Sequence, residues 1–322
     1  MAHELEIVDG VAKMAYAGDV PWHGLGTKVP ADLTPAQMQK AAGLDWTVAK
    51  ASLKFNGSSK GAYSTAGDKM ALYRESDGKF LDVVSQSWNP VQNSEAFDFF
   101  NEFVSAGDME MHTAGSLKDG QIVWALAKVK DSFDLFGGDQ VDNYLLFTNP
   151  HKFGRGIDIR MTPIRVVCNN TLSMSLSTKA KNSITLNHRK EFVKEEALEA
   201  MGAAKDQFDK YKEMATFLGS KKIKDTETMI EYFNNVFPKT NGGKFEKFAS
   251  RNAEETFNVM ETQPGAKYAE GSWWQAFNAV TFMVHHKMGR SNDNRLYNSW
   301  YGYNKDRKTR AANLALEFAD AA

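Results

Sequence analysis

The hydrophobic pattern of this 322-residue chain changes its period at about residue 187, and this change limits the folds that it can adopt. Before it, short segments such as Ile157–Val167 alternate apolar and polar residues, which is typical of half-buried strands. After it, apolar residues recur every three or four positions from Lys190 to Leu218, which is typical of an amphipathic helix. We therefore predict an α+β protein. A mostly antiparallel sheet with packed helices occupies residues 1–187, and an all-helical region follows over residues 188–322.

Local signals place the elements of both parts. Met109–Leu117, an Asp-Gly turn and Gln121–Val129 form the strongest hairpin signal. The pair Asn169-Asn170 predicts a helix cap, with a helix that begins near Thr171. Cap residues and apolar spacing predict further helices over Thr34–Ala42, Ser94–Val104, Asp225–Val236, Phe245–Met260, Ser272–Met288 and Lys305–Ala319.

Composition limits the class of protein. Hydrophobic residues make up 42% of the chain, which is enough for a sizeable core. A single cysteine excludes an intramolecular disulfide framework and indicates a reducing compartment. No apolar run approaches the roughly 18–20 residues that a membrane span needs, and the first ten residues lack a signal-peptide pattern. We expect a cytoplasmic protein without membrane contact.

Basic residues gather in two places, although the net charge of the chain is -1. Between His151 and Lys190 there are eight lysines and arginines and one acid, Asp158. Segregated positive charge is expected of a protein that binds a polyanion. The predicted nucleic-acid contacts in this first cluster are Lys152, Arg155, Arg160 and Arg165.

The second cluster lies near the end of the chain and interleaves cations with aromatic residues. Cations follow a phosphate backbone and aromatic rings stack on unpaired bases, which favours single-stranded over duplex nucleic acid. A solvated helix end beside aromatic core residues is the structural alternative. The predicted contacts here are Lys287, Arg290, Arg295, Trp300, Tyr301, Arg307 and Lys308.

Signals for catalysis, metals and cofactors are weak. The chain has no Gly-Lys-Ser/Thr phosphate loop, no Gly-x-Gly-x-x-Gly after a strand and no His-Glu-x-x-His. The adjacent His285 and His286 point about 100° apart on a helix, so they do not easily share one ion. We therefore predict no catalytic residue, no metal and no cofactor. A nuclease or nucleotide hydrolase around His151 and Cys168 stays open as an alternative.

Several segments resemble a family of phage/plasmid-like proteins with a domain of unknown function. The matching motifs are the segments 14–26, 148–151, 162–172 and 274–286, together with Arg295, Gly302 and Lys308. The resemblance covers almost the whole chain and implies a mobile genetic element as the source, with no established activity. The chain departs from the family at Lys152-Phe153-Gly154-Arg155, where members commonly carry a Gly/Ser-rich stretch.

The leading hypothesis is a phage-encoded protein that binds single-stranded DNA in the host cytoplasm. It would act in recombination or replication, with strand-annealing recombination proteins as the analogue, and would form a homo-oligomer. Annealing needs a groove that holds the backbone and presents bases, without a cofactor or catalytic residues. The alternative is an anti-restriction protein that binds a host defence enzyme, with the acidic remainder of the chain mimicking the charge of DNA.

Overall fold

The computed structural model describes the chain in segments. They are residues 5–18, 24–57, 63–165, 170–171, 184–186, 188, 209–239, 247–288, 298 and 302–321. Unit 1, the first of two compact units, comprises Met1–Lys130, Leu145–Arg160 and Ser183–Met201, and unit 2 comprises Asp131–Tyr144, Met161–Asn182 and Gly202–Ala322. The division therefore differs from the predicted boundary at residue 187, because two segments before that residue fall in unit 2.

The predicted α+β class is confirmed. The largest sheet has the strand order β12-β11-β10-β9-β8-β3-β4, and β13 also pairs with β11. The pairs β3–β8, β8–β9, β11–β12 and β11–β13 are antiparallel, whereas β3–β4 is parallel. The strands of this sheet are β3 Met14–Tyr16, β4 Thr27–Lys28, β8 Met109–Leu117, β9 Ile122–Leu135, β10 Asp139–Pro150, β11 Ile157–Arg165, β12 Asn170–Thr171 and β13 Ile184–Leu186.

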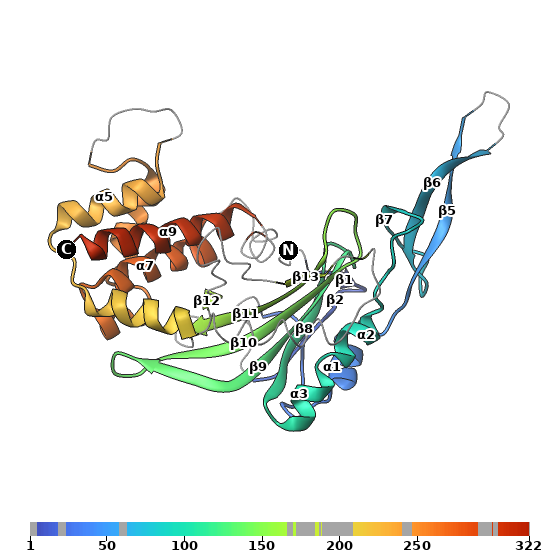
Figure 1. The fold of residues 1–322 in the computed structure, drawn as a ribbon, viewed down its shortest axis with the longest axis horizontal. Coiled ribbons are helices and arrows are strands. Elements are labelled where there is room, and N and C mark those ends of the chain that lie inside the picture. The colour runs from blue at the N-terminus through green and yellow to red at the C-terminus, as the bar shows by residue number, and fades with distance from the viewer. Residues whose placement is uncertain are drawn as a thin grey trace. The chain divides into compact units, whose positions relative to one another are not determined.

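Two smaller sheets belong to unit 1. One is the short pair β1 (Ile7–Val8) and β2 (Val11–Ala12). The other has the order β5-β6-β7, with all pairs antiparallel. Its strands are β5 Val48–Asn56, β6 Tyr63–Arg74 and β7 Phe80–Ser85. In Figure 1, β5 and β6 continue well past the end of β7 as a two-stranded ribbon.

The predicted hairpin of β8 and β9 is confirmed. The helix predicted to begin near Thr171 is wrong at the residues that the structure describes, Asn170 and Thr171. Asn170 and Thr171 form β12, paired with Arg165 and Ile164 of β11. The pair that resembles a helix cap in sequence therefore extends the sheet. Residues 172–183 lie outside the described residues.

Short helices in unit 1 follow their cap residues. In α1 (Pro35–Ala41) the predicted cap Thr34 accepts a hydrogen bond from the backbone of Gln37. The helix predicted over Ser94–Val104 is split into α2 (Asn93–Asp98) and α3 (Asn101–Ala106). The break falls at Phe99 and Phe100, which are both buried and both pack on Phe147.

Helices dominate the described part of unit 2. Residues 209–220 are helical, and Asp225 caps α5 as predicted. The predicted helix over Phe245–Met260 is shorter in the structure, because Ser250 caps it. The other elements are α5 Thr226–Val236, α6 Arg251–Val259, the 3-10 turn η1 Ala266–Ala269, α7 Trp273–Phe282, the π-helical turn η2 Met283–Lys287 and α9 Tyr303–Asp320.

Gly219 lies inside its helix and does not end it. The helix continues to Ser220, and a β-carbon on Gly219 would clash with the ring of Phe136. The glycine therefore permits a close approach between this helix and the turn after β9.

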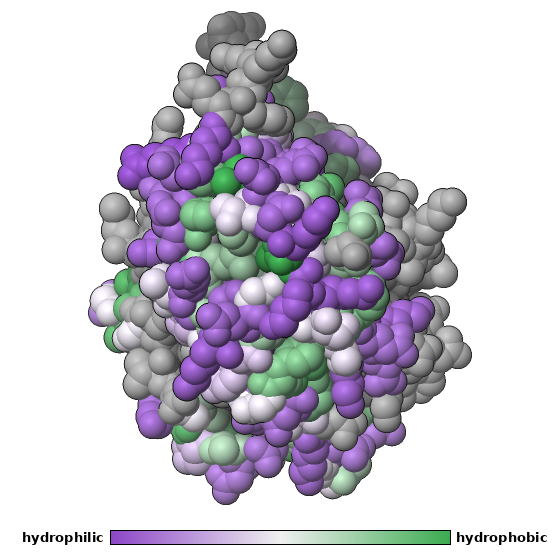
Figure 2. All heavy atoms as spheres, turned by 90° about the vertical axis from the view of Figure 1, so that its left-hand side faces the viewer, coloured by the Kyte–Doolittle hydropathy of each residue, from purple (hydrophilic) through white to green (hydrophobic). Residues whose placement is uncertain are grey.

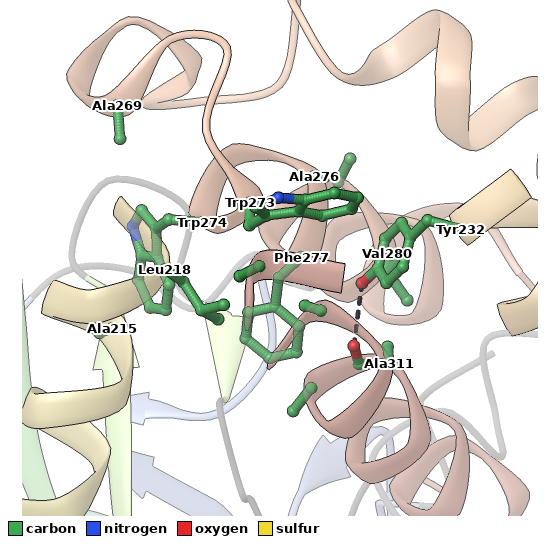
Figure 3. Packing of buried hydrophobic residues seen from close by; sticks show 14 of the residues in the cluster. Ala215, Leu218, Tyr232, Ala269, Trp273, Trp274, Ala276, Phe277, Val280 and Ala311 are labelled. Carbon is green, nitrogen blue, oxygen red and sulfur yellow. Dashed lines mark hydrogen bonds between the residues drawn. The ribbon is translucent and has the colours of Figure 1, made fainter. Parts of the chain in front are cut away.

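An aromatic core holds the helices of unit 2 together (Figure 3). The rings of Trp273 and Tyr232 meet edge to face at 5.4 Å, and Tyr232 Oη donates a hydrogen bond of 3.1 Å to the carbonyl of Ala311. The indole of Trp274 donates to Asp139 Oδ2 over 3.1 Å. Hydrophilic residues cover most of the face drawn in Figure 2, with smaller groups of hydrophobic residues between them.

Candidate functional site

The loop from His151 to Gly156, between β10 and β11, is the most distinctive surface feature of the first predicted cluster. We call it the basic loop. Phe153 is 61% exposed, and it is flanked in sequence by Lys152 and Arg155, which are both half-buried. Gly154 turns the chain with φ +79°, a conformation that favours glycine. The loop therefore presents an aromatic ring to solvent between two cations.

Hydrogen bonds fix the backbone of the basic loop to neighbouring strands of unit 1. The N–H of His151 donates to the carbonyl of Gln121 over 2.8 Å, and the N–H of Phe153 donates to Asp82 Oδ2 over 2.8 Å. Lys152 Nζ lies 3.4 Å from Gln121 Oε1. Because β7 and the residue before β9 both hold it, the position of Phe153 is set before any ligand binds.

The buried side chain of His151 holds the start of the basic loop in place. Its Nε2 lies 2.9 Å from Asn93 Oδ1, while the amide nitrogen of Asn93 donates to the carbonyls of Leu44 and Trp46. Because Asn93 Oδ1 can only accept, the neutral imidazole of His151 carries its proton on Nε2. The side chain is fully buried, and this burial, followed by the charge of His188, lowers the pKa of His151 to about 3.

His188 lies in a similar environment. Its ring stacks on Trp88 with a centroid distance of 4.3 Å, and its Nδ1 lies 3.2 Å from the carbonyl oxygen of Asn89. Burial lowers the pKa of His188 to about 4, although the carbonyls of Asn89 and Pro150 raise it in part. Both histidines are therefore neutral at pH 7.

This burial bears on the alternative of a hydrolytic site. The side chain of His151 has no exposed surface with which to contact a substrate. Cys168 lies outside the described residues. His151 is thus a positioning residue for the basic loop in this structure.

The prediction that Arg160 lines a binding groove is wrong. Arg160 is buried, and its guanidinium forms two hydrogen bonds to the carboxylate of Asp158, of which that from Nε to Oδ1 is 2.8 Å. Strand alternation places residues 158 and 160 on one face of β11, which brings the two charges together. Arg165 is the last residue of β11 and pairs with Asn170.

The second predicted cluster is only partly described. Lys287 is exposed at the end of η2, and the guanidinium of Arg307 lies 5.3 Å from the centre of the Phe237 ring. Burial, together with the charge of Arg310, lowers the pKa of Arg307. The predicted contacts outside the described residues are Arg290, Arg295, Trp300 and Tyr301.

The prediction that Lys308 contacts nucleic acid is wrong. Lys308 is fully buried, and its Nζ lies 3.1 Å from His285 Nε2. It lies three, four and seven residues before buried alanines of α9, at positions 311, 312 and 315. This spacing places Lys308 on the helix stripe that packs into the core. The same spacing is visible in the sequence and marks Lys308 as a core position.

Sequence reasoning missed three exposed aromatic residues in unit 1. Phe153 lies inside the predicted cluster, and the ribbon of β5 and β6 exposes Phe55 (52%) and Tyr63 (73%). The sequence signal that could have identified the ribbon is its charge, because residues 46–67 contain no aspartate or glutamate.

Two further findings concern metals and membranes. Within the described ranges, no group of three or more His, Cys, Asp or Glu side chains is arranged to hold a metal ion. None of the helices that the structure describes is long and apolar enough to cross a membrane.

The fold and the basic loop define an α+β protein that presents an aromatic ring between two cations. A family model described as a domain of unknown function (DUF932) matches residues 80–301, so the chain belongs to this family. No curated protein and no solved structure matches the chain.

Proposed function

We propose that the protein binds single-stranded nucleic acid through the basic loop. The observation that carries the proposal is the exposed ring of Phe153 between Lys152 and Arg155, on a backbone held by Gln121 and Asp82. An exposed ring offers a stacking platform for an unpaired base, worth about 1–3 kcal/mol per base. The two cations offer contacts to the phosphates on either side.

The basic loop favours a single strand over a duplex. Bases in a duplex already stack on one another, so a single exposed ring gains little from them. Stacking is also tolerant of sequence, since every base has a π-face. We therefore expect modest sequence preference. Strand annealing by a homo-oligomer in recombination or replication is the finer proposal.

Fluorescence anisotropy with a labelled 20-nucleotide strand tests this proposal. We expect the double variant Lys152→Gln/Arg155→Gln and the single variant Phe153→Ala each to weaken binding about tenfold, by the loss of phosphate contacts and stacking. Arg251→Gln is the control for a lost surface charge, because Arg251 is 89% exposed in α6 and lies outside both predicted clusters. Wild-type affinity in all loop variants would contradict the proposal.

The same variants separate the proposal from its alternative, a protein that binds a host defence enzyme through acidic surface. Neutralising Lys152 and Arg155 leaves such an interaction intact, because an acidic surface makes it. A co-purified host enzyme that both wild type and the double variant retain, with no strand binding by either, would favour the alternative.

A further inference from the structure

Among the described residues, no third strand pairs with the outer part of the ribbon formed by β5 and the distal half of β6. We call its described residues 53–57 and 63–67 the arm. β7 pairs with β6 only from Lys69 to Tyr73, and beyond this point β5 and β6 pair only with each other among the described residues (Figure 1). An isolated two-stranded ribbon is marginally stable in water and leaves an unpaired edge. An arm of this kind is therefore expected to have a binding role.

Most arm residues are exposed on both faces of the ribbon. The burial pattern of β5 ends in three exposed residues, and that of β6 begins with three. Phe55 and Tyr63 are 52% and 73% exposed. Because the protein buries neither ring, both rings can contact a ligand.

Strand register places a cation beside Tyr63. Lys54 pairs with Thr65 and Asn56 pairs with Tyr63, so Lys54 and Tyr63 lie diagonally on one face of the arm. Phe55 pairs with Ser64 and lies on the opposite face. No acidic residue occurs between positions 46 and 67, so the charge of the arm suits a polyanion.

A hydrogen bond ties the basic loop to the three-stranded sheet that carries the arm. The N–H of Phe153 donates to Asp82, which pairs with Leu72 in β6. Leu72 pairs with Lys50 and Tyr63 pairs with Asn56, so the two positions are six residues apart on β5, which is roughly 20 Å at about 3.3 Å per residue. β6 has nine residue steps over the same span, because the register shift between Ser52 and Lys54 places extra residues in β6.

We propose that the arm is a second contact for the same nucleic-acid strand, with Tyr63 as a stacking platform and Lys54 as a phosphate contact. The inference rests on the proposed function of the basic loop. At about 3.4 Å per nucleotide, a span of roughly 20 Å corresponds to about six nucleotides, and a stretched strand needs fewer. The binding site is thus longer than the basic loop alone.

Binding to labelled thymidine oligonucleotides of 4, 8 and 16 nucleotides tests the inference with the full chain. Wild type is expected to bind the 16-mer at least tenfold more tightly than the 4-mer, because only the longer strand reaches both contacts. The double variant Lys54→Gln/Tyr63→Ser is expected to lose most of this gain while it keeps wild-type affinity for the 4-mer. Phe153→Ala is expected to weaken binding to all three lengths.

The outcomes separate the two proposals. Wild-type length dependence in Lys54→Gln/Tyr63→Ser would overturn the arm contact and leave the loop contact standing. Failure of wild type to bind any length would overturn both. If the double variant Lys54→Gln/Tyr63→Ser keeps the wild-type length dependence but differs from wild type in its sedimentation coefficient, the arm contacts a second copy of the chain. That result would also overturn the inference. Since both side chains are exposed, unchanged thermal unfolding is the folding control, and Tyr63→Ser alone is the milder variant.

Discussion

The backbone N–H of Phe153 donates a 2.8 Å hydrogen bond to the carboxylate of Asp82, which ties the exposed ring of the basic loop to β7. A second bond, from the N–H of His151 to the carbonyl of Gln121, holds the start of the loop. Pre-organisation of this kind lowers the entropy that a loop loses when it binds a ligand.

Asp82→Ala is expected to weaken single-strand binding severalfold, because the loop loses one anchor. Asp82→Asn keeps an acceptor oxygen but removes the charge, so it is the matched control for electrostatic effects. Anisotropy titrations of both variants check this expectation. Stronger binding by both variants would show that the carboxylate only repels the strand.

Arg74 is expected to be the most costly single charge to remove from unit 1. Its guanidinium is buried between Glu6 Oε1 at 2.8 Å and Asp77 Oδ2 at 2.6 Å, and it lies over the ring of Trp46 at 5.1 Å. The hydrogen bonds from Arg74 to Asp77 lower the pKa of Asp77 to about 2. Arg74→Leu leaves the buried Glu6 carboxylate without its closest cation, so we expect a loss of about 3–5 kcal/mol in the free energy of unfolding.

Urea denaturation measures this loss. Arg251→Ala is the control, because Arg251 is 89% exposed and pairs with Glu255 on the surface of α6. We expect a change of less than about 0.5 kcal/mol there. Equal effects of the two substitutions would contradict the account of the buried network.

The neutral, buried histidines predict a loss of stability at acidic pH. The pKa of His151 falls from 6.5 to about 3 in the folded protein, and that of His188 falls to about 4. Between these values and 6.5 the unfolded chain binds more protons than the folded one, so stability falls as pH decreases. The contribution is present above pH 6.5 and declines below it, by about 2 kcal/mol per histidine at pH 5.

Unfolding free energies at pH 7.5 and pH 5 check this prediction. His151→Gln lowers stability at pH 7.5, because it disturbs the contact with Asn93, but its pH dependence is expected to be about half as steep. An equally steep decline in this variant would show that other groups cause the acid sensitivity.

Gly219→Ala is expected to destabilise unit 2 by several kcal/mol, since its β-carbon would clash with the Phe136 ring. An ordinary Gly→Ala change inside a helix would instead stabilise it by about 1 kcal/mol. Glu213→Ala, an exposed position of the same helix, is the control. Thermal unfolding distinguishes the two signs directly, and a rise in Tm for Gly219→Ala would contradict the close approach.

Sequence patterns predicted the elements that depend on local signals. The helix cap at Thr34, the hairpin of β8 and β9 and the helix capped by Asp225 are all confirmed. Each depends on residues within a few positions of one another. The strand at Asn170 was missed because its pairing with Arg165 outweighs the local preference for a helix cap.

The charge pattern of the sequence located the basic loop, but it did not show which cations are exposed and which are buried. Arg160 and Lys308 count as cations in the sequence, yet both are buried against specific partners, Asp158 and His285. The alternation along β11 indicates the burial of Arg160, and the alanine spacing of α9 indicates the burial of Lys308. Burial of a charge depends on the partner that the fold supplies, and this is not a property of composition.

The most direct test of the central claim is a salt series of binding to a labelled single strand and to its duplex. The account predicts tighter binding to the single strand, with an affinity that falls steeply as salt increases. Replacing Lys152 and Arg155 with glutamine should reduce the slope of log affinity against log salt by about 1.4, since each phosphate contact contributes about 0.7. An unchanged slope in this variant, or the absence of binding at low salt, would contradict the account.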